Sequence, residues 1–540
     1  MKTVVKEQIP ELSDLPEGER TATVELLLSI CHRQQEQLKA QSEQIQQLKD
    51  EIAILKGEKA RPKIKPSRLS KDAQGDAGQG EQKKKKRRGK PKRKKTAELA
   101  IHDEQIIEPD HIPEGSQFKG YEPYVVQEIE FKLKNTNYLR ARYQTPDGES
   151  VVGVLPASVA GSHFGPELRS YILSQSYQQH VPQKLILKQL WEWDVAISSG
   201  QLNRLLIHGH ERFHEEKAAV LRTGLEVSSH LNVDDTGARH QGKNGYCTHI
   251  GNEWFAWFSS TESKSRINFL ELLRADHSEY VVDEVAREYM THQKLPQGPL
   301  ALLSQDQVCA DHAAWQATLQ GLGIITERHI RIATEGALVG SLVCHGLSPE
   351  LVIMSDDAGQ FNIAGFLNAL CWVHAERTIH KLIAFSDPNR QAQETVREQI
   401  WTFYQDLKAY KLDPNEGDKL RLEQRFDAIF TQKTVFHSLN LALRRLHENK
   451  TELLLVLERP DIPLHNNLSE NDIRDYVKRR KISATTRSEA GRKARDTFLS
   501  LKKTCQKLGL SFWQYLQDRV SQANEIAPLP SLIRAAAQGP

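Results

Sequence analysis

Three groups of acidic residues, far apart along the chain, stand where carboxylates can do chemistry. Asp234 and Asp235 follow the alternating stretch "VSSHLNV", and Asp356 and Asp357 follow "PELVIMS". Glu470 comes much later, within "PLHNNLSENDIRDYVKRRK". Carboxylate oxygens are hard ligands that suit magnesium or manganese. Two such ions close together would activate an attacking oxygen and stabilise a leaving oxygen in phosphoryl transfer.

Each of these acids also has a plain structural interpretation. Aspartate favours turns and strand exits for conformational reasons, so either aspartate pair alone is explained by a turn. Asn467 followed three residues later by Glu470 matches a capping box, in which each side chain satisfies the other's backbone N–H. A cap and a metal ligand are competing uses of one carboxylate. Metal binding by Glu470 therefore predicts an imperfect cap.

The segments around the aspartates indicate an α/β fold. "GYCTHIG" and "EWFAWFSST" are typical of strands separated by a turn at Gly251-Asn252, and "SRINFLELLR" is typical of a helix. The apolar run Leu351–Met354 predicts a buried strand that leads directly into the second aspartate pair. Ligands gather at the carboxyl edge of an α/β sheet, so two such pairs favour a shared site.

The helix predicted over "ALCWVHAERTIHKL" follows the second aspartate pair. His374 and Arg377 lie on adjacent turns of one face, where they could reach a phosphate or pair with nearby acids. Cys371 and His374 have the spacing of half a zinc site. Nothing in the sequence supplies the other half, so Cys371 is interpreted as a core residue.

The composition describes a globular protein of several domains. The chain has 540 residues, of which 39% are hydrophobic and 26% charged, and two to four domains are expected. Its six cysteines lie far apart, which fits a reducing compartment and excludes a Cys-x-x-Cys zinc ribbon. The N-terminus does not match a secretory signal, and no run reaches the roughly 18 apolar residues of a membrane span. We expect a cytoplasmic protein with no membrane partner.

The N-terminal region predicts self-association. From Thr23 to Lys56 a heptad pattern places Val24, Cys31, Leu38, Ile45 and Ile52 at position a, and Leu27, Gln34, Gln41, Leu48 and Leu55 at position d. Branched residues at a with leucine at d favour a parallel two-stranded coiled coil, and hence a homodimer. The alternative is a single amphipathic helix that packs on its own chain.

A basic segment follows the predicted coiled coil. Residues 61–118 have few large apolar side chains and are expected to be disordered. A dense block of cations within this segment predicts contact with nucleic-acid phosphates, the alternative being a solubilising tail. Its members are Lys83, Lys84, Lys85, Lys86, Arg87, Arg88, Lys92, Arg93, Lys94 and Lys95.

Order is predicted to resume near Gly120. The stretch up to Ser158 alternates around a "PDG" turn and indicates short antiparallel strands. Helical spacing follows, with a break near Val181-Pro182 and a helix start at "ISSGQLNRLL", capped by Ser198 or Ser199. This pattern is similar to a helix-turn-helix, and many helical linkers share it.

Four blocks, "NVDDTG", "SDDAGQF", "CWVHAER" and "HNNLSENDIR", resemble the transposases of the IS66 family of insertion sequences. The match covers roughly Gly120 to Val520. The resemblance implies a DDE-type enzyme on a ribonuclease H-like fold, with a catalytic and metal-binding triad of Asp234, Asp356 and Glu470. Asp235 and Asp357 then become neighbours of the site. Two divalent ions, Mg²⁺ or Mn²⁺, are the implied cofactors.

Two further expectations accompany the resemblance. Cations after Glu470 on the same predicted helix could track a DNA backbone, or form a solvated face; they include Arg474, Lys478, Arg480 and Lys481. IS66 proteins commonly carry a cysteine-rich zinc-binding segment before the core. The corresponding residues, Gly120–Ser158, contain no cysteine, so no zinc is expected.

We expect the chain to divide into seven segments. They are a coiled-coil helix (1–60), a disordered basic linker (61–118), a small β segment with a helical DNA-binding region (119–225), the first part of the core (226–386), an all-α insertion (387–460), the last part of the core with the Glu470 helix (461–525), and a flexible tail (526–540). The insertion could contact DNA, contact a second subunit, or buttress the site.

The implied activity is cleavage at the ends of an insertion sequence followed by strand transfer into target DNA. The implied partners are the terminal inverted repeats, target DNA, a second protomer and accessory proteins of the same element, with the enzyme at the nucleoid. Two rival functions are a DNA-binding protein that retains the fold without catalysis, and a metal-dependent nuclease without strand transfer.

Overall fold

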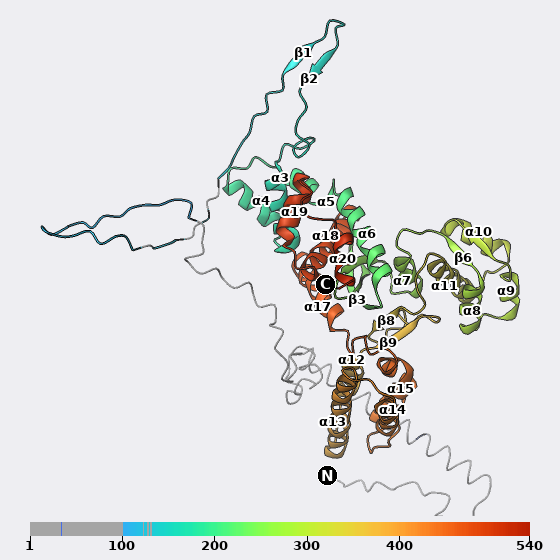
Figure 1. Ribbon diagram of the computed structural model, residues 1–540. Helices are drawn as coiled ribbons and strands as arrows, with labels where there is room; N and C mark the ends of the chain where they lie inside the picture. The colour runs from blue at the N-terminus through green and yellow to red at the C-terminus, as the bar shows by residue number, and fades with distance from the viewer. Residues whose placement is uncertain (1–33, 35–100, 123, 127–128, 130–131, 540) are drawn as a thin grey trace, which may run out of the picture. The chain divides into compact units, whose positions relative to one another are not determined.

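The computed structural model describes residues 34, 101–122, 124–126, 129 and 132–539 (Figure 1). These described residues fall into two compact units, the first within 156–188 and 197–539 and the second within 101–155 and 189–196. Apart from Gln34, the predicted coiled coil and the cation block at Lys83–Lys95 lie outside the described residues. Within the described part of the chain, no helix has the length and apolar character that crossing a bilayer requires.

The described part of the second unit contains a short hairpin. Strands β1 (Arg142–Gln144) and β2 (Ser150–Val152) pair antiparallel. The amide of Gly148 donates to the carbonyl oxygen of Thr145 at 2.9 Å, and its φ of +82° is a conformation that glycine adopts without strain. The hairpin predicted at "PDG" is confirmed, although both strands are largely exposed.

A five-stranded mixed sheet lies in the first unit. Its spatial order is β5-β4-β3-β8-β9, in which β3, β4 and β5 form an antiparallel meander and β8 and β9 run parallel to β3. The strands are β3 (His230–His240), β4 (Lys243–Gly251), β5 (Ala256–Thr261), β8 (Val352–Ser355) and β9 (Leu367–Leu370). The predicted strands on both sides of Gly251-Asn252 and the strand before Asp356 are confirmed.

One strand boundary differs from the prediction. The first aspartate pair was expected to close its strand, but β3 continues through Asp234 and Asp235 to His240. The reason is the hairpin with β4, whose turn residues Gln241 and Gly242 have φ values of +50° and +79°. Positive φ at both central positions suits a two-residue hairpin turn, and it keeps β3 and β4 paired beyond the aspartates.

A smaller α/β region is inserted between β5 and β8, and the sequence did not predict it as a separate region. Its two-stranded sheet packs against α11, where Gly336 and Gly340 let the helix approach α8 and β6 closely. The elements are α7 (Arg266–Leu273), β6 (Tyr280–Val282), α8 (Glu284–His292), α9 (Gln297–Leu302), β7 (Gln307–Cys309), α10 (His312–Gly321) and α11 (Glu327–Cys344).

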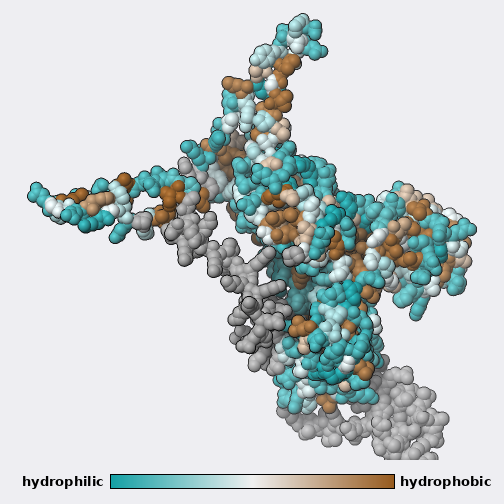
Figure 2. Space-filling view, viewed as in Figure 1, coloured by the Kyte–Doolittle hydropathy of each residue, from teal (hydrophilic) through white to brown (hydrophobic). Residues whose placement is uncertain are grey.

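The segment from 387 to 457 is helical and shares a core with the sheet. Trp372, at the start of α12 (Trp372–His380), is buried among Phe403, Phe426 and Phe430, and its Nε1 donates to the carbonyl oxygen of Leu453 at 2.9 Å. Side chains of β8 and β9 belong to the same cluster. The viewed face of this helical segment is mainly hydrophilic (Figure 2). Its helices are α13 (Asp387–Tyr410), α14 (Glu416–Phe430), α15 (His437–Glu448), α16 (Lys450–Leu454) and the 3₁₀ turn η5 (Leu455–Leu457).

Two late helices pack on the meander. Helix α17 (Asn467–Ser483) contributes Ile473 and Tyr476 to a cluster with residues of β3, β4 and β5. Helix α18 (Glu489–Lys507) lies along β5, where the hydroxyl of Ser500 accepts from the amide of Phe258 at 2.9 Å. Thr504 Oγ1 and Asp496 Oδ2 of α18 likewise accept from the amides of Ala256 and Ser260. These bonds occupy the amides of an edge strand, which protects that edge from pairing with another chain.

The remaining helices precede β3 or follow α18 in the chain. They are α3 (Pro166–Leu173), the π-helical turn η4 (Ser174–Gln178), α4 (Gln183–Glu192), α5 (Ser199–Ile207), α6 (Glu211–Val227), α19 (Phe512–Ser521) and α20 (Leu529–Ala537). The break predicted near Val181-Pro182 falls between η4 and α4. Ser198 caps α5 in a complete capping box with Gln201, which confirms the predicted helix start.

Candidate carboxylate site

The register of the sheet places Asp234 and Asp356 at the same level of adjacent strands. The last residues paired between the parallel strands β3 and β8 are Asn232 and Met354. Asp234 lies two residues beyond Asn232, and Asp356 lies two residues beyond Met354. The sheet itself therefore brings the two predicted aspartates together, although they are far apart in the sequence.

Asn466 brings the third acid to this point. Its side-chain Nδ2 donates to the carbonyl oxygen of Val233 at 2.7 Å, and its Oδ1 accepts from Asn232 Nδ2 at 2.9 Å. Its backbone amide donates to Cys371 Sγ at 3.1 Å. Asn466 is fully buried and is the residue from which α17 starts, so the first turn of that helix, with Glu470, is fastened to β3.

The predicted capping box between Asn467 and Glu470 does not form. Helix α17 starts from Asn466, one residue earlier than a box between Asn467 and Glu470 requires, and it has no side-chain cap. The amide of Glu470 instead makes the first helical hydrogen bond, to the carbonyl oxygen of Asn466 at 3.2 Å. The Glu470 carboxylate is consequently not used as a cap.

The electrostatics couple the three acids. Burial, followed by the charge of Asp356, raises the pKa of Asp234 to about 7. Asp235 and Glu470 add to the increase, whereas the hydrogen bond from the Asp235 amide, 2.7 Å from Asp234 Oδ1, opposes it. Nearby carboxylates disfavour the ionised form of a carboxyl group and so raise its pKa. The acids therefore behave as members of one site.

The side chains of His374, Arg377 and Arg474 approach Glu470 without making hydrogen bonds to it. Its Oε1 lies 3.5 Å from His374 Nε2 and 3.6 Å from Arg377 Nη2, and its Oε2 lies 3.8 Å from Arg474 Nη2. Within the described residues, Oε1 is buried and has no hydrogen-bond partner. Of the two roles predicted for Arg377, pairing with a nearby acid is the one that this contact supports, whereas His374 Nε2 accepts from Arg377.

His374 is held in its neutral form. Burial, then the charge of Arg377, lowers the pKa of the imidazole, and the negative charges of Glu470 and Asp356 only partly oppose this. His374 Nε2 lies 3.2 Å from Arg377 Nη1 and accepts a hydrogen bond from it. A neutral imidazole has a free lone pair for this bond, which an imidazolium lacks.

The neighbouring aspartates have partners of their own. Asp235 pairs with Lys264 Nζ at 2.7 Å and accepts from Gln360 Nε2 at 2.5 Å. Asp357 pairs with Arg445 Nη2 of α15 at 2.6 Å. Both contacts agree with the role of neighbours rather than ligands. Sequence reasoning did not single out Lys264, Gln360 or Arg445, since no motif marks them.

The three acids fit the divalent ions that the resemblance implies. A buried carboxylate oxygen without a hydrogen bond and a carboxyl with a raised pKa both indicate unbalanced negative charge. Oxygen-only donors of this kind suit Mg²⁺ or Mn²⁺ rather than softer metals. Asp234, Asp356 and Glu470 could therefore hold such ions.

The cations predicted to contact DNA on α17 fall into two kinds. Arg474, Lys478 and Lys481 are exposed, and Lys478 Nζ lies 3.5 Å from Asp475. Arg480 is half-buried, and its Nη1 donates to the carbonyl oxygen of Gly237 in β3. Arg480 thus has a packing role within the protein.

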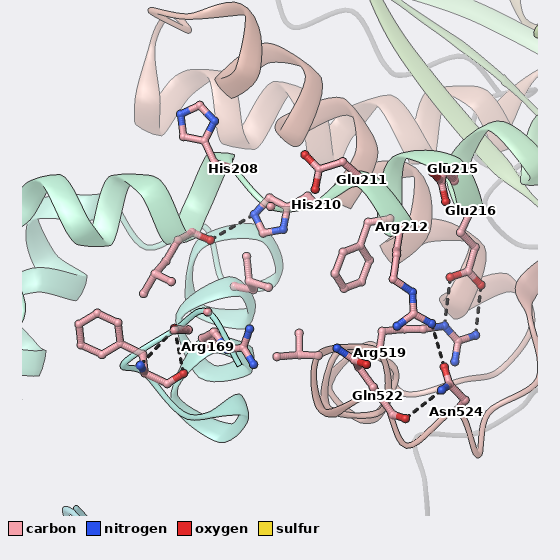
Figure 3. A pocket seen from close by; sticks show the side chains of 18 of the residues that line it. Arg169, His208, His210, Glu211, Arg212, Glu215, Glu216, Arg519, Gln522 and Asn524 are labelled. Carbon is pink, nitrogen blue, oxygen red and sulfur yellow. Dashed lines mark hydrogen bonds and ion pairs between the residues drawn. The ribbon is translucent and has the colours of Figure 1, made fainter. Parts of the chain in front are cut away.

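A separate cavity of about 960 Å³ lies among α3, α5, α6 and the end of α19 (Figure 3). Arg519 pairs with Glu216 at 3.1 Å, and Arg212 donates to Asn524 at 3.1 Å. None of the three acids of the carboxylate site lines it. Five arginines and three glutamates are among its lining residues: Arg169, Arg204, Arg212, Arg222, Arg519, Glu211, Glu215 and Glu216.

Fold and site together define a mixed α/β protein with an acidic cluster beside the central strands of its sheet. The chain belongs to the IS66 transposase family, because residues 342–494 match the family described as "Transposase IS66 family". The matched range contains Asp356 and Glu470, and Asp234 lies before it. The chain is also 44% identical over 323 residues to the uncharacterized protein y4jO of Sinorhizobium fredii (strain NBRC 101917 / NGR234), covering 59% of this chain and the whole of that relative. The predicted family resemblance is confirmed, and membership implies an enzyme that acts on nucleic acid and binds DNA.

Proposed function

We propose that this protein is a DDE-type DNA transposase that cleaves at the ends of an insertion sequence and transfers the cut strand to target DNA. The observation that carries the proposal is that the charges of Asp356 and Glu470 both contribute to the raised pKa of Asp234. The parallel register of β3 and β8 aligns the two aspartates, and Asn466 fastens the Glu470 helix to the residue before Asp234.

The topology of the sheet supports a ribonuclease H-like core. A three-stranded antiparallel meander continued by two parallel strands is the arrangement expected of that fold, and α17 crosses the meander beside the aspartates. In this proposal the core comprises 226–386 and 461–525, with a second α/β region between β5 and β8.

Asp234, Asp356 and Glu470 would hold two divalent ions, which supply activation of the attacking oxygen and charge stabilisation at the leaving oxygen. The protein's own residues prepare the site. Asp234 releases its proton when cations offset the neighbouring charges, and Asn466 orients the helix of Glu470. Lys264 and Gln360 hold Asp235, which keeps that carboxylate away from the triad.

The proposed reaction has two in-line displacements. Water attacks a phosphodiester at the end of the element, a P–O bond forms, the bond to the 3′ oxygen breaks, and a free 3′-hydroxyl results. That hydroxyl then attacks a phosphodiester of target DNA and displaces its 3′ oxygen. Positioning and charge stabilisation are the main contributions of the protein to such steps.

DNA contacts are proposed on two surfaces besides the cation block at Lys83–Lys95. The exposed Arg474, Lys478 and Lys481 follow Glu470 along α17 and would meet the backbone as it leaves the site. The helical region within 119–225 contributes several arginines around the cavity of Figure 3. Arg377 and His374 would act closer to the reacting phosphate.

The remaining segments have structural roles in the proposal. The helical insertion at 387–460 buttresses the site, because it shares a core with β8 and β9 and its Arg445 holds Asp357. The segment 1–60 would pair two protomers through a coiled coil, so that two element ends are held together. Accessory proteins of the same element and a location at the nucleoid belong to the same proposal.

The test compares two adjacent aspartates. Asp356→Asn should abolish Mg²⁺-dependent cleavage of a DNA duplex carrying the element end, with DNA binding nearly intact. Asp357→Asn, the matched control, should retain cleavage because its partner is Arg445 rather than the triad.

Two outcomes would refute the proposal. Full cleavage by Asp356→Asn would exclude this residue from catalysis, and wild-type protein that binds DNA but never nicks it would indicate the non-catalytic function. A strand-transfer assay with a pre-cleaved end separates a transposase from a nuclease, since a nuclease would not join the 3′-hydroxyl to target DNA.

A further inference from the structure

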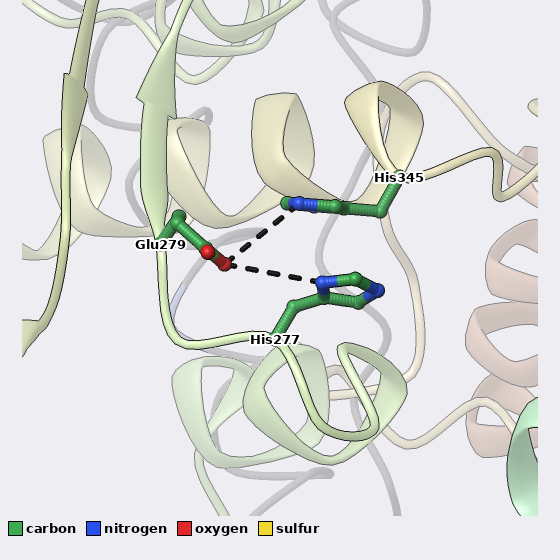
Figure 4. A group of neighbouring side chains, drawn as sticks. All are labelled: His277, Glu279 and His345. Atoms are coloured by element: carbon green, nitrogen blue, oxygen red, sulfur yellow. Dashed lines mark ion pairs between the residues drawn. The ribbon is translucent and has the colours of Figure 1, made fainter.

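His277, Glu279 and His345 form a cluster in the small α/β region, away from the triad in sequence. His277 lies in the turn after α7, Glu279 immediately precedes β6, and His345 follows α11 (Figure 4). One potential ligand atom from each lies within 4.8 Å of the others. The geometry points to a binding site for a borderline transition-metal ion such as Zn²⁺, held by two imidazoles and one carboxylate.

The distances fit a shared ion better than direct hydrogen bonds. Glu279 Oε2 lies 3.7 Å from His345 Nε2 and 3.9 Å from His277 Nδ1. Hydrogen bonds between such atoms span about 2.7–3.2 Å. A tetrahedral zinc ion with bonds of about 2.0–2.2 Å separates its ligand atoms by about 3.3–3.6 Å. A contraction of a few tenths of an ångström would bring Glu279 Oε2 to this spacing from each histidine nitrogen, and the two histidine nitrogens lie within 4.8 Å of each other.

The hydrogen bonds around the cluster orient two of the three ligands in advance. His345 Nδ1 lies 2.7 Å from the carbonyl oxygen of Ser341, so this nitrogen carries the proton and donates. The lone pair of the neutral ring is then on Nε2, the atom nearest Glu279. Metal-bound histidines are commonly fixed by a second-ring hydrogen bond of this kind. Glu279 Oε2 in turn accepts from the Ser278 amide at 3.0 Å.

The third ligand has freedom to adjust. The rings of His277 and His345 stack at 3.7 Å with an interplanar angle of 23°. Ligand lone pairs lie in the ring planes, so ion binding requires the stack to open. His277 is exposed and comes from a turn, which permits that rotation. The fourth tetrahedral position would be taken by water.

The donor set determines the class of ion. Two imidazole nitrogens with one carboxylate suit Zn²⁺ or its first-row neighbours, whereas Mg²⁺ prefers oxygen alone. The site thus differs in metal preference from the oxygen-only triad. An ion here would clamp the turn between α7 and β6 to the end of α11.

This inference departs from the expectation that the protein binds no zinc. That expectation rested on two observations about cysteine. The chain has no closely spaced cysteine pair, and Gly120–Ser158 contains no cysteine. His345 is distant in sequence from His277 and Glu279, so no short spacing motif reveals the three residues. Only the packing of α11 against β6 brings them together.

The test is calorimetric titration of the full-length protein with ZnCl₂, in a buffer whose excess Mg²⁺ competes for the carboxylate triad. We expect saturable binding of one ion per chain by the wild type. His277→Ala and Glu279→Gln should each weaken the affinity at least tenfold. His292→Ala, at an exposed histidine of α8 outside the cluster, should bind as the wild type does.

A second measurement guards against misfolding. Zn²⁺ should raise the Tm of the wild type and of His292→Ala, and this increase should be lost in His277→Ala and Glu279→Gln, whose metal-free Tm should match that of the wild type. Glutamine retains an oxygen to accept from Ser278, so Glu279→Gln should leave the turn intact. Zinc affinity that is equal in all four proteins, or no saturable binding by the wild type, would overturn the assignment.

Discussion

Asn466 donates its side-chain amide to the carbonyl oxygen of Val233 across 2.7 Å, and this bond joins the two halves of the carboxylate site. Val233 immediately precedes Asp234, and Asn466 starts the helical turn that contains Glu470. The bond therefore sets the distance between two acids separated by more than 200 residues of chain. Because Asn466 is fully buried, water cannot replace the bond.

Replacing Asn466 should damage both stability and cleavage. Asn466→Ala removes the side-chain partner of the Val233 carbonyl and of the Asn232 side-chain amide. Each buried group left unsatisfied costs about 1–3 kcal/mol. Cleavage should fall more than tenfold even at temperatures where the variant is folded, because Glu470 loses its anchor. Urea denaturation and a duplex cleavage assay measure the two effects. Asn471→Ala, an exposed position on the same helix, should change neither.

The raised pKa of Asp234 predicts a pH-dependent stability in metal-free buffer. The ordinary pKa is 3.8 and the folded value is about 7, so between these values the unfolded chain loses a proton that the folded chain keeps. Stability therefore falls as pH rises through this window, by about 4 kcal/mol at most. Asp234→Asn removes this dependence, so the variant should gain stability relative to wild type at pH 8 and gain little at pH 4.

Comparison at each pH cancels the other groups that titrate, such as His374. Tm measured in EDTA across pH 4–8 provides the readout, and Asp357→Asn serves as the control for removing a carboxylate next to the site. A constant difference between Asp234→Asn and wild type over the whole range would contradict the raised pKa.

Much of the sheet could be predicted because each of its strands carries a local signal. The alternation in "GYCTHIG" and the apolar run Leu351–Met354 are visible without any partner. The end of β3 could not be predicted from the sequence, because a strand that pairs with its hairpin neighbour can continue through two aspartates. The region around β6 and β7 was missed as a unit because three-residue strands give almost no periodicity.

The acids of the candidate site came from the family blocks, whereas its supporting contacts had no signal in the sequence. The family blocks located Asp234, Asp356 and Glu470, whereas the register that aligns the aspartates is a property of pairing between distant strands. Asn466 stood within the "HNNLSENDIR" block, yet nothing local distinguishes a cap from a bridge to β3. The capping-box interpretation was reasonable in the sequence and failed because the helix starts one residue earlier.

The shared core of the insertion predicts that apolar packing, rather than its ion pair, supports the site. Phe426→Ala opens a cavity beside Trp372 and should destabilise the protein by about 3–5 kcal/mol. Arg445→Ala removes a pair whose arginine side chain is 64% exposed, and it should cost less than about 1 kcal/mol. Urea unfolding of both variants tests the ranking, and a larger loss in Arg445→Ala would assign the buttressing to charge.

The cation block at Lys83–Lys95 predicts how salt weakens DNA binding. Each phosphate that the protein neutralises releases condensed counterions, so log affinity falls with log salt by about 0.9 per phosphate on duplex DNA. Deleting residues 83–95 should flatten this slope by that amount for every phosphate that the block neutralises. Cleavage at low salt should be retained, because the triad lies elsewhere.

The measurement is a salt titration of duplex binding by fluorescence anisotropy. Replacing the block with an equally long Gly-Ser segment controls for linker length. A slope that remains unchanged in the Gly-Ser variant would show that the block does not bind phosphates, and its role would then be limited to solubility.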